Sequence, residues 1–387
     1  MKLLRVIRSV HPRGGGPVEA LKQVSAVLTQ RGHQVEVASL DAPGAPGTND
    51  FPLPLHALGT GRDGYGYAPG FAPWLRAHAG SFDAVIVHGV WQYHSFAAWR
   101  ALHAARTPYF VYPHGMLDPW FKRTYPLKHW KKWLYWPWAE YRVLRDARAV
   151  LFTCAAERDL ARESFWLYRC RERVVSYGTA APAGDGAGQR AEFEAKFPAT
   201  RDRRVLLFLG RVHVKKGVDL LLRAFAQLTD ISQEPWHLVI AGPAEAALLT
   251  QLQALAEQLH LTQRVTWTGL LQGDLKWGAL RVAEAFVLPS HQENFGVAVA
   301  EALACGVPVL ISDQVNIWHE IEQDRAGLVA PDTQAGVSEL LHRWQKLSAN
   351  ERGELRTRAA ECFARRYEIH RVTDDLLQTL RESGVNA

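Results

Sequence analysis

The sequence predicts an α/β protein built from two doubly wound parallel-sheet domains. Three observations predict this fold class. The chain has 387 residues, which is long for a single core and sufficient for two. Short apolar runs alternate with segments of helical periodicity in both halves. A stretch rich in Gly and Ala begins after Gly178 and extends toward Asp202, where it predicts a domain boundary.

The first half starts with an apolar run, residues 3–10, which is typical of a buried strand. A glycine loop follows, and then apolar residues at helical spacing up to Gly32 predict a helix. The next strand is expected at 33–40, and further strands at 82–89, 108–115 and 149–154. This order indicates a parallel sheet within a first domain of residues 1–178.

The second half repeats that order within residues 179–365. Strands are expected at 203–210, 236–242, 264–269 and 283–290, with helices at 218–228 and from Ala244 onward. Residues 366–387 are expected to form a final helix that packs back on the first domain. Ligands of such sheets bind at loops after the carboxyl ends of the strands, so we expect a cleft between the domains lined by these loops.

Composition limits the function classes. Residues 1–180 carry 23 Lys and Arg against 13 Asp and Glu, whereas the remainder carries 22 against 26. Surface charge can drift without a function, but this asymmetry favours an anionic partner for the first half. Four cysteines without a C-x-x-C pair argue against a zinc site or a disulfide framework. No uncharged apolar run is long enough to span a membrane, so the prediction is a cytoplasmic protein.

Two acids lie around the start of an apolar helix in "PSHQENFGVAVAEALACG". The helix is expected to begin near Phe295 and Gly296, which leaves the amides of residues 294–296 directed at a phosphate. Glu293 would precede this helix, and Glu301 would lie within it. The neighbours of Glu301 are apolar on all faces, which favours a buried carboxylate over a solvent-facing one. Carboxylates bind vicinal hydroxyls well, so both acids predict a sugar ligand.

Cations follow an expected strand in "LGRVHVKKGVDLLLRAF". Arg211 and Lys216 are predicted to bracket a diphosphate, whereas Lys215 is interpreted as a solvated lysine.

In the first half, the glycines at 14–16 either offer amides to a ligand or form a tight turn. His114 and His88 each end an expected strand. His114 is a candidate to contact a substrate hydroxyl or a developing cation, and His88 alone is better explained as structural.

The segment Trp120–Tyr141 holds nine aromatic residues, five of them Trp, interleaved with Lys and Arg. This composition is typical of a helix that lies on an anionic membrane surface, and it also suits stacking on single-stranded nucleic acid. The alternative is a core stripe at helical spacing, with Trp133, Trp136 and Lys132 on the outer side. The stripe would consist of Leu127, Trp130, Leu134, Tyr141 and Leu144.

The motifs "LGRVHVKKGVD" and "ENFGVAVAEALACGVPVLIS" resemble the retaining glycosyltransferases of family four, which have the GT-B fold of two Rossmann-like domains. The E-x7-E signature of that family corresponds to Glu293 and Glu301. The resemblance covers nearly the whole chain. "HGMLDPW" with the basic segment after it also resembles members that build bacterial surface polysaccharides at the inner leaflet of the cytoplasmic membrane.

The resemblance implies metal-independent transfer of a hexose-type sugar from a nucleotide-sugar to a glycan or lipid-linked saccharide, with no further cofactor and no nucleic-acid partner. It implies that Arg211, Lys216 and the amides of Asn294, Phe295, Gly296 and Val297 hold the diphosphate. It further implies that Glu301 binds the ribose, Glu293 and His114 contact the donor sugar, Gly15 and Gly16 approach the sugar and phosphates, and Leu270 and Leu271 meet the base. An epimerase or hydrolase of nucleotide-sugars and a nucleic-acid-binding protein are the alternatives.

Overall fold

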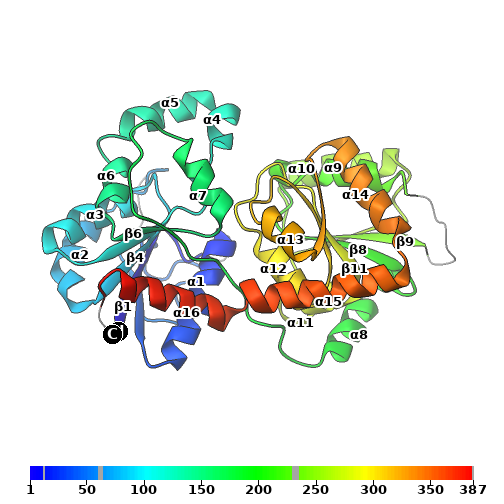
Figure 1. Cartoon of the computed structure of the whole chain (residues 1–387), viewed down its shortest axis with the longest axis horizontal. Coiled ribbons are helices and arrows are strands. Elements are labelled where there is room, and N and C mark those ends of the chain that lie inside the picture. Colours follow the sequence, from blue (N-terminus) through cyan, green and yellow to red (C-terminus); the bar gives the residue numbers. More distant parts are fainter. Residues whose placement is uncertain (12–13, 60–63, 229–234, 386–387) are drawn as a thin grey trace. The chain divides into compact units, whose positions relative to one another are not determined.

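The computed structural model describes residues 1–11, 14–59, 64–228 and 235–385. The chain divides into two compact units, one made of Met1–Gly178 with Ile369–Ala387 and the other of Thr179–Glu368. Each unit is an α/β sandwich around a parallel sheet, as the sequence predicts (Figure 1).

The described residues of the first unit contain a seven-stranded parallel sheet in the order β3-β2-β1-β4-β5-β6-β7. The strands are β1 Lys2–Ile7, β2 Gln34–Ser39, β3 Leu55–Ala57, β4 Ala84–His88, β5 Tyr109–Tyr112, β6 Ala149–Phe152 and β7 Glu172–Val174. The strands β4, β5 and β6 are buried along their whole length, which explains their continuous apolar sequences.

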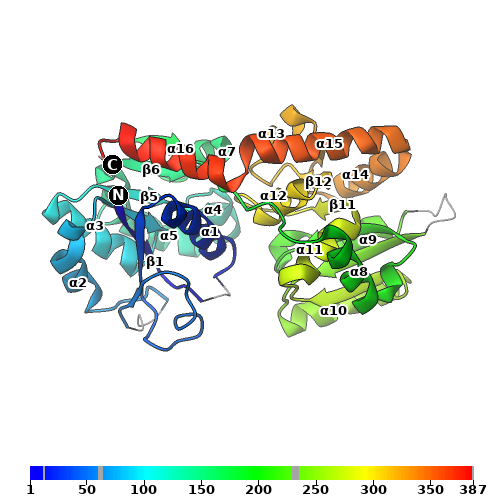
Figure 2. The ribbon, with the colours of Figure 1, turned by 90° about the horizontal axis from the view of Figure 1, so that it is seen from below.

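Helices cover both faces of this sheet (Figure 2). They are α1 Gly16–Gln30, α2 Phe71–His78, α3 Tyr93–Ala105, α4 Trp120–Thr124, α5 Pro126–Tyr135, α6 Glu140–Asp146, α7 Ala155–Arg162 and α16 Ile369–Glu382, with a short 3-10 turn at Ala79–Ser81. The last helix, α16, packs on α1, and Arg31 of α1 forms an ion pair with Asp374 of α16.

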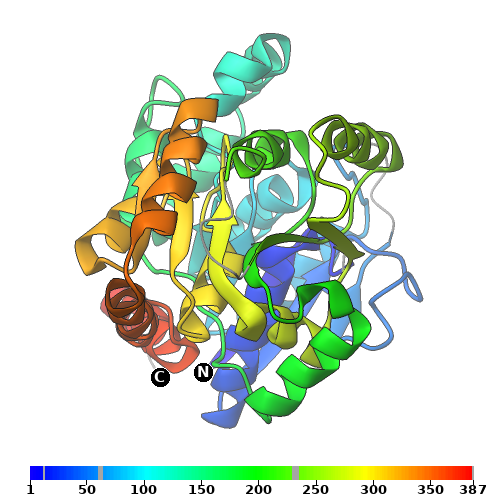
Figure 3. The same ribbon diagram turned by 90° about the vertical axis from the view of Figure 1, so that its right-hand side faces the viewer.

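The described residues of the second unit contain a six-stranded parallel sheet in the order β10-β9-β8-β11-β12-β13. The strands are β8 Arg204–Leu209, β9 Trp236–Ala241, β10 Val265–Gly269, β11 Ala283–Leu288, β12 Val309–Ser312 and β13 Gly327–Ala330. Figure 3 shows them with helices on both sides. The helices are α8 Gly186–Lys196, α9 Val218–Phe225, α10 Ala246–Gln258, α11 Gly273–Val282, α12 Val297–Ala304, α13 Trp318–Asp324, α14 Gln334–Lys346 and α15 Ala349–Arg366.

The Gly- and Ala-rich stretch after Gly178 is not a bare linker. Asp185 caps α8 by accepting hydrogen bonds from the amides of Ala187 and Gly188. The side chain of Gln189 on this helix donates to Asp274 of α11 over 2.9 Å. The stretch therefore contributes a packed helix to the second unit.

Candidate functional site

The candidate site in the second unit lies where the strand order of the sheet reverses. β8 has β9 and β10 on one side, and β11, β12 and β13 on the other. Loops that leave the carboxyl ends of two such central strands diverge and open a ligand-binding crevice. The loop after β8 carries Arg211 and Lys216, and the loop after β11 carries Glu293 and leads into α12. The sequence motifs thus belong to the two loops that flank the switch point.

A close backbone approach joins these two loops. Gly217 has a φ of 63°, and a Cβ there would lie 2.2 Å from the carbonyl oxygen of Pro289, at the end of β11. The amide of His291 also donates to the carbonyl of Lys215 over 2.7 Å. Only glycine permits this contact, which fixes the loop of Lys216 against the loop of Glu293.

The start of α12 carries no side chain that would prevent a ligand from approaching its backbone. Its N-cap is Gly296 with a φ of 77°, and no side chain caps the helix. The preceding loop is held in place because the amide of Glu293 donates to Gln314 and the amide of Asn316 donates to Glu293. Phe295 is buried beside it. The first amides of α12 and the partial positive charge of the helix start form a site suited to an anion.

Lys216 forms an ion pair with Glu293. Burial, with the nearby cations Lys215 and Arg211, lowers the pKa of Lys216 to about 8 despite that pair. Arg211 affects this pKa, so the two side chains predicted to bind the diphosphate, Arg211 and Lys216, are close enough to interact electrostatically. The side chain of Lys215 contacts Gln292 over 3.0 Å, so it contributes to loop packing rather than being merely solvated.

Glu301 is buried, with 6% of its surface exposed. The alternative of a solvent-facing Glu301 is therefore wrong. Its carboxylate accepts a charge-assisted hydrogen bond of 2.7 Å from Lys276 on α11. Pairing of this kind compensates for much of the cost of removing a carboxylate from water. Lys276 was not among the predicted site residues, because its segment carries no motif and lies 25 positions before Glu301.

The two residues expected near a nucleotide base differ in exposure. Leu270 and Leu271 follow β10, with Leu270 exposed and Leu271 buried. Gly269, which ends β10, has a φ of 68° and redirects the chain before them. These residues lie after an outer strand of the same sheet, two positions from β8 in the strand order.

The first unit has its own switch point, between β1 and β4. Gly15 caps α1 after β1 with a φ of 69° and no capping side chain, and Gly16 is the first residue of that helix. Gly15 and Gly16 thus lie at an uncapped helix start, as a phosphate-facing loop requires. Pro12 and Arg13, just before these glycines, lie outside the described residues.

His114 follows β5 and belongs to a chain of hydrogen-bonding side chains. Its ring contacts Tyr177 Oη over 2.7 Å and His88 Nδ1 over 3.1 Å. His88 in turn lies 3.3 Å from Arg5 Nη1, a buried guanidinium on β1. His114 has a φ of 55°, which is uncommon for a residue with a Cβ and is frequent at functional sites.

Burial, followed by the charges of His94 and Arg5, lowers the pKa of His114 to about 3. Burial and Arg5 likewise hold the pKa of His88 well below its ordinary value. Both imidazoles are neutral at pH 7, so His114 can hydrogen-bond a sugar without repelling positive charge that develops there. Arg5 and Tyr177 were absent from the prediction, since contacts between residues so distant in sequence leave no local pattern.

The core-stripe alternative for Trp120–Tyr141 is wrong. Three of the five residues assigned to it are exposed, namely Leu127 at 84%, Trp130 at 63% and Leu134 at 48%. Trp136, expected on the outer side, is completely buried and stacks on Phe165. The helical spacing fails because α5 ends at Tyr135 and Pro137 lies in the break before α6. The helices α4 and α5 contain no buried residue.

Across the described ranges, no group of three or more His, Cys, Asp and Glu is arranged to hold a metal ion. None of the helices in these ranges combines the length and the apolar character needed to cross a bilayer.

Comparisons with known proteins agree on one class. A family model described as "Glycosyl transferases group 1" matches residues 189–362, and one described as "Glycosyl transferase 4-like domain" matches residues 15–178. Together the two matches span most of the chain. The crystal structure of HepE from Anabaena in complex with UDP and glucose superposes with a TM-score of 0.78, covering 99% of this chain and 100% of that one at 17% identity.

Two curated relatives are similar over part of the chain. The alpha-D-kanosaminyltransferase of Streptomyces kanamyceticus is 29% identical over 254 residues, which is 64% of this chain and 64% of the relative. The D-inositol 3-phosphate glycosyltransferase of Mycobacteroides abscessus is 33% identical over 167 residues, which is 41% of this chain and 36% of the relative. The matched regions thus span less than two thirds of the length of these relatives.

Proposed function

Because the chain belongs to the glycosyltransferases with the GT-B fold, we propose that it transfers a hexose-type sugar from a nucleotide-diphosphate donor to a glycan or lipid-linked saccharide. The observation that supports this most strongly is the composition of the switch point in the second unit. There, Arg211, Lys216 and the uncapped start of α12 offer positive charge, while Glu293 and Glu301 offer carboxylates. A nucleotide-diphosphate sugar presents the complementary groups, namely two phosphates and several hydroxyls.

The ion pairs of this site define what a donor has to replace. Lys216 is held by Glu293, and Glu301 by Lys276. When the donor binds, its diphosphate replaces Glu293 as the ion-pair partner of Lys216. The carboxylate of Glu293 then accepts hydrogen bonds from the donor sugar. Glu301 accepts the ribose hydroxyls. The lowered pKa of Lys216 fits this exchange, because a poorly solvated ammonium gains from a second anionic partner.

The proposed chemistry needs no nucleophile from the protein and no metal. As the bond between the anomeric carbon and the diphosphate breaks, negative charge on the leaving group is stabilised by Arg211, Lys216 and the start of α12. The acceptor hydroxyl attacks on the face that the diphosphate leaves and passes its proton to the departing phosphate oxygen. The configuration of the anomeric carbon is thereby retained. His114, being neutral, hydrogen-bonds the donor sugar near the reacting carbon.

We also propose that α4 and α5 seat the protein on an anionic membrane surface at the inner leaflet, where lipid-linked acceptors would be met. The exposed apolar side chains of this membrane patch are Tyr125, Leu127, Trp130, Trp133, Leu134, Trp138, Trp166 and Leu167. Exposed Trp and Leu beside Lys122, Arg123, Lys128 and Lys131 match an interfacial helix. Stacking on nucleic acid would use the same residues, but the carboxylates of the second unit favour a sugar.

The test follows UDP-, GDP- and dTDP-linked hexoses by NMR, with and without lipid-linked saccharides extracted from bacterial membranes, in the presence of EDTA. We expect the extract to accelerate nucleoside-diphosphate release from one donor and to yield a glycoside with the donor's anomeric configuration. Rapid appearance of an epimer or of free sugar without acceptor would instead identify an epimerase or a hydrolase. An inverted product, or loss of transfer in EDTA, would contradict the mechanism.

A further inference from the structure

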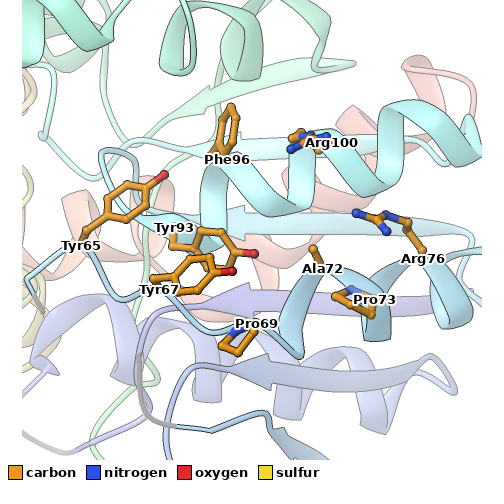
Figure 4. Close-up of a pocket in the computed structure, with 9 residues that line it drawn as sticks. All are labelled: Tyr65, Tyr67, Pro69, Ala72, Pro73, Arg76, Tyr93, Phe96 and Arg100. Carbon is orange, nitrogen blue, oxygen red and sulfur yellow. The ribbon is translucent and has the colours of Figure 1, made fainter. Parts of the chain in front are cut away.

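A pocket of about 440 Å³ lies on the first unit between α2, α3 and the loop before α2. Its walls combine the aromatic side chains of Tyr65, Tyr67, Tyr93 and Phe96 with the guanidinium groups of Arg76 and Arg100. Figure 4 shows the tyrosine rings at one end and the two arginines, from neighbouring helices, at the other. This volume is within the range of small-ligand sites, which are typically aromatic with a few polar groups.

The two arginines are not neutralised by the protein. Both are exposed, and among the residues that the structure describes no acid forms an ion pair with Arg76 or Arg100. Arg100 makes a cation–π contact with the ring of Phe96, 6.0 Å away. Burial raises the pKa of Tyr93, as does Tyr67, while Arg100 and Arg76 oppose this rise. Both guanidinium groups are therefore close enough to interact electrostatically with the Tyr93 hydroxyl at the aromatic end of the pocket.

The pocket is adjacent to features already assigned. Tyr93 follows His88, the last residue of β4, by five positions, which spans at most about 18 Å of extended chain. At the other side, Tyr65 Oη is 2.6 Å from Tyr135 Oη of α5. The pocket thus adjoins α5 and lies at the start of α3, the helix that follows β4.

We propose that this pocket binds a sugar ring that carries an anionic group, and that this ring is part of the acceptor. Aromatic faces cover the C–H face of a sugar, tyrosine hydroxyls hydrogen-bond its oxygens, and two forked guanidinium groups bind a carboxylate or phosphate in bidentate fashion. The assignment to the acceptor rests on the proposed function; the anionic-sugar site does not.

The experiment is ligand-observed saturation-transfer NMR on the full chain with methyl β-D-glucuronide, glucose 1-phosphate and methyl β-D-glucoside as probes. Inorganic phosphate has no carbon-bound proton to observe, so its binding is measured by competition with the charged sugar that binds. We expect the glucuronide or the sugar phosphate, or both, to bind, and whichever binds identifies the anionic group. The neutral glucoside and inorganic phosphate should each bind at least about tenfold more weakly. Equal binding of the glucoside, equal binding of inorganic phosphate, or no binding of either charged sugar would overturn the proposal.

Variants locate the site. The double substitution Arg76→Gln with Arg100→Gln should weaken binding of the charged sugar about tenfold or more. Arg106→Gln, at the exposed C-terminal cap of the same α3, removes an equal charge per site and should have no effect. Lys216→Ala should also leave this binding unchanged, which separates the pocket from the donor site. Unchanged binding in the double variant would overturn the proposal, whereas failure of sugar transfer alone would count only against the proposed function.

Discussion

At the scale of single residues, the charge state of Lys216 links the geometry of the proposed donor site to the proposed activity. Its ammonium is paired with Glu293, yet burial and neighbouring cations lower its pKa to about 8. Diphosphate binding requires the charged form, since the neutral amine offers no cation to the leaving group. The free protein therefore loses a positive charge at the donor site as the pH rises through about 8.

The expected consequence is a decline in kcat/KM for the donor above about pH 8, approaching tenfold per pH unit. This follows because the pH dependence of kcat/KM reflects the pKa values of ionisable groups in the free enzyme. Lys216→Arg is the matched control: a guanidinium stays charged, so this variant should have lower but pH-independent activity up to pH 10. A wild-type kcat/KM that stays constant up to pH 10 would contradict the proposed role of Lys216.

At the scale of secondary-structure elements, the donor site depends on how the loop after β8 meets the end of β11. Gly217 makes this contact, and no other residue fits there. Gly217→Ala places a methyl group against the carbonyl of Pro289 in a left-handed conformation. We expect it to lower the free energy of unfolding by about 2 kcal/mol and to weaken donor binding, since Lys216 is displaced.

The matched control is Gly353→Ala in α15, where an added Cβ meets nothing within 4 Å. This change should raise the stability by about 0.5–1 kcal/mol, because alanine favours the helix. Urea denaturation measures both variants. Equal stabilities for Gly217→Ala and the wild type would show that the contact between the loops is not structurally required.

The membrane patch makes a prediction about α5. Replacing Trp130 and Trp138 with Ser should reduce co-sedimentation with vesicles of anionic lipid several-fold, because both rings are more than 60% exposed and available to the bilayer interface. The fold should be unaffected. Val174→Ser, an exposed apolar residue on β7 outside the patch, serves as the control. Unchanged sedimentation of the double variant would contradict a role of α5 and the segment after it at the membrane.

Local patterns predicted these elements better than they predicted side-chain contacts. The central strands of both sheets and the start of α12 follow from apolar runs and Gly296, whereas the short edge strands β3, β7 and β13 were not expected. The apolar surroundings of Glu301 correctly indicated its burial. The core-stripe alternative for Trp120–Tyr141 fails because it carries the helical spacing across Pro137. Lys276 as the partner of Glu301 and Tyr177 as the partner of His114 could not be predicted, since each contact joins segments that are far apart in the sequence and meet only in the folded unit.

At the scale of the whole molecule, the two units share the same arrangement of their parallel sheets. Each unit has a strand-order reversal with an uncapped helix start beside it, at Gly15 in the first unit and at Gly296 in the second. The second unit adds paired acids and cations, which suit a nucleotide-sugar. The first adds the membrane patch and the basic aromatic pocket, which suit an acceptor, and the neutral His114, which is proposed to contact the donor sugar. This division of chemistry agrees with the excess of positive charge in the first half of the sequence.

The central claim is that a nucleotide-diphosphate sugar binds at the start of α12, and isothermal titration of such donors into the full chain tests it most directly. We expect at least one donor to bind the wild type and Glu301→Ala to bind it about tenfold or more weakly, a loss of about 1.4 kcal/mol or more. Glu339→Ala, an exposed acid on α14, should bind as the wild type does. Absence of binding by every donor, or equal binding by the Glu301→Ala variant, would contradict the claim.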